Sequence, residues 1–155
     1  MSRYLLPAFN KLVFFLLIVW SLGTSDFILF YWFDQDRFLG YTPEQHPIVL
    51  QIGGSNLDNL AKAIQLSNAY GYDEINFNCG CPSPKVAGRG CFGARLMLDP
   101  KFVAEAMSVI AANTDVPVSV KCRIGVDNRD SYNELCEFFI DFFTVFKAAM
   151  QISFY

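Results

Sequence analysis

Histidine is nearly absent from this chain of 155 residues, and its five cysteines lack the spacing of a metal site or a disulfide framework. The single histidine, His46, lies far upstream of Cys79 and Cys81, which form Cys-x-Cys instead of the Cys-x2-Cys pair of zinc sites. We therefore expect no metal centre. An odd number of unpaired cysteines indicates free thiols and a reducing compartment.

Positive charge is also scarce, because 12 Lys and Arg residues stand against 15 Asp and Glu residues, for a net charge of −3. A chain with this balance has no general attraction to nucleic acids. Any contact with RNA must therefore come from local groups of cations.

No hydrophobic run is long enough for a clean membrane span, which needs about 20 apolar residues. Residues 12–20 are apolar, but polar residues ending at Asp26 separate them from a second apolar run at residues 27–33. Basic residues before the first run and small residues after it resemble a signal peptide. Three interpretations of residues 1–35 stay open: an atypical chain start, a targeting or anchoring segment that contacts a membrane through residues 12–33, and an unusual core helix.

After a polar stretch at residues 34–45, expected to be a linker or short helix, strand patterns alternate with helix patterns. Short apolar runs predict strands at residues 47–51, 74–78 and 116–122. Apolar residues at helical spacing predict a helix after each strand, at residues 56–70, at 100–112 and from 131 onward. Strand–helix units repeated in this order predict an α/β fold with a parallel sheet and right-handed crossovers.

A loop rich in thiol, amide and glycine groups follows the second predicted strand. It begins Asn78-Cys79-Gly80-Cys81-Pro82 and continues into a glycine-rich run at residues 88–93. In parallel α/β folds, ligands bind at the carboxyl ends of the strands. Glycines would let the backbone approach a ligand closely. We expect the chemistry here; the alternative is that the cysteines are small buried hydrophobes.

The second predicted strand and the loop after it carry a resemblance to a known family. Residues 75–85, Ile-Asn-Phe-Asn-Cys-Gly-Cys-Pro-Ser-Pro-Lys, and residues 90–97, Gly-Cys-Phe-Gly-Ala-Arg-Leu-Met, resemble the signature of the tRNA-dihydrouridine synthases. Two flanking segments, residues 46–55 and 116–125, are similar to the family's strands that end in a flavin-contacting glutamine and lysine. The loop has one residue more than is usual in the family. The similarity runs from about residue 36 to about residue 139.

The resemblance implies a partial TIM (β/α)8 barrel of about three βα units, the second to the fourth. A closed barrel typically needs about 250 residues, and this chain has 155. Residues 36–139 would form the partial flavin barrel, residues 1–35 a hydrophobic segment foreign to the family, and residues 140–155 a divergent tail. Open sheet edges and uncovered apolar surface would favour self-association.

The activity implied by the resemblance is FMN-dependent reduction of uridine to dihydrouridine in tRNA, with NADPH as electron donor. Cys81 would donate the proton and Asn78 would contact the base. Gln51 and Lys121 would contact the flavin, with the lysine near the negative charge of its reduced form. For Lys85 and Arg89 two interpretations stay open: contacts to tRNA phosphates, or solvated loop cations.

Two other functions remain open from the sequence. One is a catalytically inactive fragment that acts by association or membrane attachment. The other is a flavoprotein of the same architecture with a small-molecule substrate. The family and the free thiols favour the cytoplasm or an organelle, while the apolar first segment favours a membrane.

Overall fold

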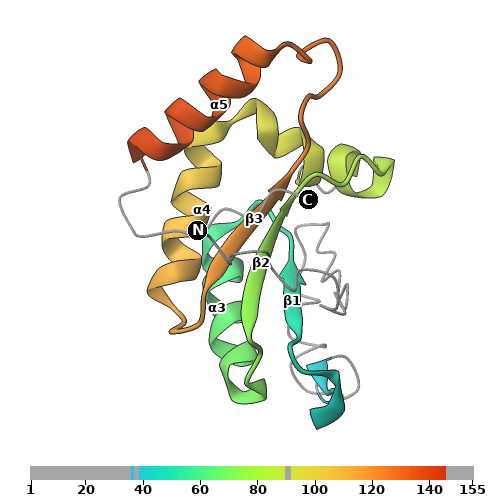
Figure 1. Cartoon of the computed structure of the whole chain (residues 1–155), viewed down its shortest axis with the longest axis vertical. Helices are drawn as coiled ribbons and strands as arrows, with labels where there is room; N and C mark the ends of the chain where they lie inside the picture. Colours follow the sequence, from blue (N-terminus) through green and yellow to red (C-terminus); the bar gives the residue numbers. More distant parts are fainter. Residues whose placement is uncertain (1–35, 37–38, 90–91, 146–155) are drawn as a thin grey trace, which may run out of the picture.

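The computed structural model describes residue 36, residues 39–89 and residues 92–145. Within them, three strands form one parallel sheet in the order β1-β2-β3 (Figure 1). The strands are β1 (Val49–Ile52), β2 (Glu74–Cys79) and β3 (Val118–Cys122). The predicted α/β fold with a parallel sheet is therefore confirmed. The register of the sheet places Gln51 beside Asn76 and Asn78 beside Lys121.

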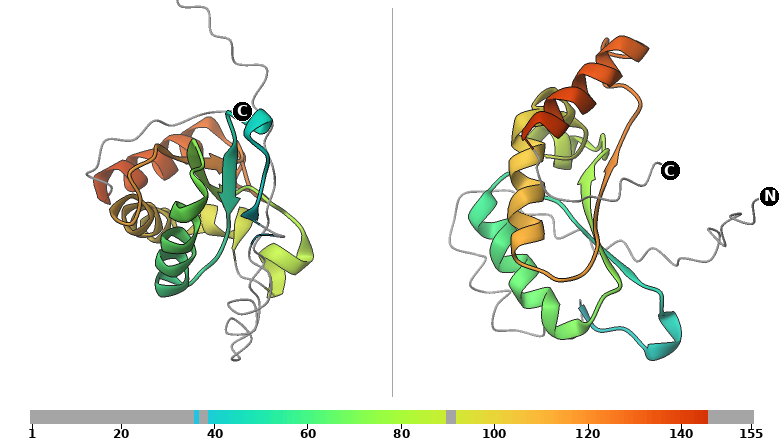
Figure 2. Two further views of the ribbon diagram at one scale, coloured as in Figure 1. Left: turned by 90° about the horizontal axis from the view of Figure 1, so that it is seen from below. Right: turned by 60° about the vertical axis from the view of Figure 1, so that its left-hand side comes forward.

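Three helices alternate with the strands and lie together on one side of the sheet (Figure 2). They are α3 (Leu57–Ser67), α4 (Pro100–Ala112) and α5 (Tyr132–Val145). A short 3-10 turn, η2 (Asn68–Tyr70), extends α3 to the predicted end, and another, η1 (Pro43–Gln45), precedes β1. Helix α4 has the predicted bounds, because Asp99 accepts a hydrogen bond from the Phe102 backbone N–H and Pro100 suits the first turn.

The hydrophobic core lies between the sheet and these helices. Ile75, Phe77 and Cys79 point from β2 into this layer and are fully or almost fully buried. Helices α3 and α4 cover them with buried apolar residues at helical spacing, among them Leu60, Ile64, Val103, Met107 and Ile110. Alternation along β2 therefore directs its other side chains away from the helices.

The segment between β2 and α4 differs from the irregular loop that the sequence predicted. It contains a π-helical turn, η3 (Pro84–Arg89), and a 3-10 helix, η4 (Gly93–Leu98). The carbonyl of Ser83 accepts from the backbone N–H groups of Val86 and Ala87, and Val86 and Phe92 are buried. Two buried apolar side chains thus fold the loop back onto the sheet. The helical turns were missed because six residues are too few to show a period.

Helix α5 continues through residue 139, where the resemblance to the family was expected to end. Ser131 and Glu134 form reciprocal bonds at its start, and Phe138 and Phe142 are buried in the core. Residues 1–35, which include the predicted apolar segment, and residues 146–155 lie outside the described residues. No helix in the described part is long and apolar enough to cross a membrane.

Candidate active site

A row of polar side chains crosses the sheet on the face opposite the helices. Gln51 Nε2 on β1 donates to Asn76 Oδ1 on β2 at 2.7 Å, and Asn76 Nδ2 donates to Ser119 Oγ on β3 at 2.8 Å. The Ser119 hydroxyl in turn donates to a carboxylate oxygen of Glu74. All four residues are buried. Burying a polar group costs free energy unless the group is hydrogen-bonded, and each of these four residues is bonded within the row.

Asn78 connects this row to the thiol-bearing turn. Its Nδ2 donates to Gln51 Oε1 at 2.8 Å, and its Oδ1 accepts from the backbone N–H groups of Gly80 and Cys81, each at 3.0 Å. Such a side-chain bond to the backbone two and three residues ahead shapes a turn. Asn78 therefore sets the direction in which the chain leaves β2 and presents Cys81.

The two cysteines of the turn lie in different environments. Cys79 is completely buried in the helix-facing core, and burial raises the pKa of its thiol well above the ordinary value. Cys81 is partly exposed, and its carbonyl accepts from the Ala94 N–H at 2.9 Å. Of these two residues, only Cys81 is partly exposed.

Gly93 lets the loop return close to Cys81. Its φ is +66°, and a Cβ placed on it would lie 2.5 Å from the Cys81 carbonyl oxygen. A side chain here would be strained by its backbone conformation and would also collide with that oxygen. The glycine thus fixes the approach of η4 to the thiol-bearing turn.

The predicted flavin-contacting residues stand on either side of Asn78. Gln51 is bonded to it from β1, and Lys121 pairs with it in register from β3. The Lys121 ammonium lies beside Gly80, where a Cβ would be only 3.2 Å from Nζ. The structure therefore gathers Gln51, Asn78, Lys121 and Cys81 at the carboxyl ends of three neighbouring strands.

Lys85 and Arg89 are placed differently from this group. Both belong to the η3 turn beyond Cys81. Their side chains lie outside what the structure describes. Their expected contact with RNA phosphates stays a prediction.

Arg123 makes a contact that the sequence did not reveal. Its Nη1 donates to the Gly80 carbonyl at 3.1 Å, and its backbone N–H lies 3.3 Å from Met97 Sδ. In the sequence, Arg123 stands two residues after Lys121, which puts both side chains on the same side of an extended chain. The partner carbonyl could not be predicted because it depends on the shape of the turn.

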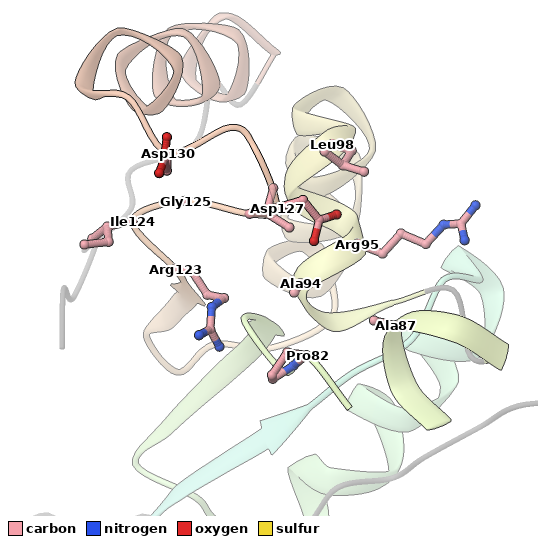
Figure 3. Close-up of a pocket in the computed structure, with 11 residues that line it drawn as sticks. Pro82, Ala87, Ala94, Arg95, Leu98, Arg123, Ile124, Gly125, Asp127 and Asp130 are labelled. Atoms are coloured by element: carbon pink, nitrogen blue, oxygen red, sulfur yellow. The ribbon is translucent and has the colours of Figure 1, made fainter. Parts of the chain in front are cut away.

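A cavity of about 900 Å³ opens beside this turn (Figure 3). Pro82 and Ala94 line it from the loop, while Arg123, Asp127 and Asp130 line it from the segment after β3. Its volume is in the range of ligand sites. In the described residues, no group of three or more His, Cys, Asp or Glu side chains gathers as metal ligands would.

Comparison with known proteins decides the family. A family model described as dihydrouridine synthase (Dus) matches residues 30–141. The chain belongs to the dihydrouridine synthase family. The predicted family membership is therefore confirmed. The matched part of the chain includes all three strands of the sheet and the Cys81 turn.

Relatives in bacteria agree with this assignment. A tRNA-dihydrouridine(20/20a) synthase of Vibrio parahaemolyticus is 52% identical over 101 residues, which are 65% of this chain and 31% of that protein. Proteins of the same name are 52% identical over 100 residues in Xanthomonas campestris, covering 64% and 29%, and 46% identical over 105 residues in Synechocystis, covering 68% and 31%. This chain thus spans about a third of the length of the curated relatives it matches.

Proposed function

We propose that this chain reduces uridine to dihydrouridine in tRNA, with Cys81 as the proton donor. The observation that carries the proposal is the partly exposed Cys81 on a turn that Asn78 holds at the carboxyl ends of parallel strands. The names of the relatives, tRNA-dihydrouridine(20/20a) synthases, support tRNA as the substrate.

The polar face of the sheet fits FMN as the cofactor. A flavin ring has hydrogen-bond donors and acceptors along one edge, and the amide of Gln51 keeps a second donor and a second acceptor site beyond its bonds to Asn76 and Asn78. Lys121 adds an ammonium group suited to the negative charge of a reduced flavin. Gln51 and Lys121 would hold the ring. When bound, FMN supplies the hydride for the uracil double bond after its own reduction by NADPH.

Reduction of a carbon–carbon double bond adds one hydride and one proton, and the protein has to provide the proton. Cys81 would give its thiol proton to one carbon of the double bond and regain a proton from solvent. Asn78 would contact the base, and its amide oxygen also bonds the backbone of the turn that carries Cys81. The buried Cys79 thiol, two residues earlier, has no path to the base.

The described strands and helices are further proposed to be units of a TIM (β/α)8 barrel. Parallel strands in sequential order, with helices on one face and a polar row on the other, match the outer and inner surfaces of such a barrel. Self-association through open edges stays a prediction. Membrane contact through residues 12–33 also stays a prediction, since those residues lie outside the described part.

Two alanine variants test the proton donor. The full chain is incubated with FMN, NADPH and tRNA that lacks dihydrouridine, and the product is measured by mass spectrometry of the nucleosides. Cys81→Ala should reduce turnover by about 100-fold or more, the contribution typical of a general acid. The matched variant Cys79→Ala should stay within a few-fold of the parent.

Two results would contradict the proposal. Equal turnover by Cys81→Ala and the parent would remove Cys81 from the reaction. Reduction of quinones or enones by the parent chain, without any reduction of tRNA, would favour a flavoprotein with a small-molecule substrate.

A further inference from the structure

We propose that Arg123 is a positioning residue that holds the Gly80–Cys81 peptide and thereby orients the Cys81 thiol. The importance of that thiol rests on the function proposed above, but the contact itself does not. The bond from Arg123 Nη1 to the Gly80 carbonyl, at 3.1 Å, is the observation from which the inference starts.

One planar peptide group is held from two sides. The Gly80 carbonyl, which accepts from Arg123, and the Cys81 N–H, which donates to Asn78 Oδ1 at 3.0 Å, belong to the same peptide. Since a peptide group is planar, fixing its oxygen and its N–H fixes the plane and the position of the Cys81 Cα. Asn78 acts from β2, and Arg123 acts from the residue after β3.

The other side of Cys81 is fixed by backbone alone. The Cys81 carbonyl accepts from the Ala94 N–H at 2.9 Å, and Gly93 closes against the same carbonyl. Cys81 is therefore held by three segments: β2, η4 and the end of β3. Of the contacts named here, the one from Arg123 carries a positive charge, which strengthens a hydrogen bond to a neutral acceptor.

Arg123 is itself anchored and faces the cavity. Its backbone N–H contacts Met97 Sδ on η4 at 3.3 Å, and Figure 3 shows its side chain reaching from the end of β3 toward Pro82. A guanidinium has five N–H donors in a rigid plane, so it can hold the Gly80 carbonyl and still present donors to the cavity. A lysine would offer the charge without this fixed geometry.

Arg95 supplies a matched control. It lines the same cavity from η4 and carries the same charge. In Figure 3 its side chain points away from Pro82 and from Arg123. Removing Arg95 therefore changes the charge of the cavity without removing the bond to Gly80.

The test is amide hydrogen exchange of the full chain, resolved by residue with NMR. Arg123→Met, which keeps the length of the side chain but has no donor, should speed exchange of the Gly80 and Cys81 amides about three- to tenfold, the loss expected for one hydrogen bond. The amides of Ile75 and Phe77 in β2 should keep their rates. Arg123→Lys should restore part of the protection, and Arg95→Met should leave all four amides unchanged.

Three results would overturn the inference. Unchanged exchange at Gly80 and Cys81 in Arg123→Met would show that the bond does not hold the peptide. An equal acceleration in Arg95→Met would assign the effect to charge in the cavity. Faster exchange at Ile75 and Phe77 as well would make Arg123 a general stabiliser of the fold. None of these readouts needs turnover, so absence of tRNA reduction would contradict the proposed function and leave the result on Arg123 standing.

Discussion

The two faces of strand β2 are both buried, but different interactions stabilise them. Ile75, Phe77 and Cys79 face the helices, and their side chains belong to the hydrophobic core. Asn76 and Asn78 face the opposite side, and their amides bond to neighbouring strands and to the next turn. Burial alone therefore does not distinguish the hydrophobic core from a candidate binding face. A buried sheet face that stays polar is the face to examine for a ligand.

The same contrast continues one turn further along the chain. Cys79 ends the apolar face and is completely buried, while Cys81, beyond Gly80, is partly exposed. Strand alternation alone would put two residues at this spacing on the same face. The two cysteines differ in exposure because β2 ends at Cys79 and Asn78 bonds the backbone of the turn that follows. Three variants test this contrast, from the largest effect to the smallest.

Phe77→Ala removes a side chain from the apolar face and should have the largest effect on stability. Phe77 is completely buried between the sheet and the helices. Loss of its ring should lower the free energy of unfolding by about 3–5 kcal/mol, the range for a buried Phe replaced by Ala. Urea unfolding followed by circular dichroism measures the change. A loss below about 1 kcal/mol would contradict the assignment of this face as the core.

Asn76→Ala removes an amide from the polar face. The change leaves Gln51 Nε2 and Ser119 Oγ without the partner each has in Asn76, and both are buried. The free energy of unfolding should fall by about 1–3 kcal/mol for such orphaned groups.

The matched control for this change is Asn68→Ala. Asn68 is exposed and donates from its amide to the Asn113 carbonyl. That variant should lose less than about 1 kcal/mol. Equal losses in the two urea titrations would show that the polar row adds nothing to stability.

Cys79→Ala should change the pH dependence of stability. Burial raises the pKa of the Cys79 thiol in the folded chain, so the folded state keeps this proton at pH values where the unfolded state has lost it. The resulting stability is complete below the ordinary thiol pKa of about 8.5 and is lost as the pH rises beyond it. The variant should therefore show a shallower decline above that pH, by about 1.4 kcal/mol per pH unit. Parallel declines would contradict a buried, protonated Cys79.

The sequence predicted the elements with a strong pattern. The three strands and the helix at residues 100–112 needed only alternation, helical spacing and turn residues. The choice of Cys81 came from the resemblance to the family and stays a prediction. The contacts of Asn78 and Arg123 could not be predicted. Both end on backbone groups of Gly80 and Cys81, whose positions exist only once the turn has formed. The η3 and η4 turns were missed for a related reason, since Phe92 is buried beside Gly53 and Val86 is buried beside Gly93 only once the loop has folded back.

The most direct test of the polar face as a flavin site is a titration of the purified, folded chain with FMN, followed by flavin fluorescence. We expect a saturable change with a dissociation constant on the order of 1 μM, equivalent to about −8 kcal/mol. Lys121→Ala should weaken binding about tenfold, because the ammonium beside Gly80 no longer contributes. No saturable change, or equal binding by the variant, would contradict the account.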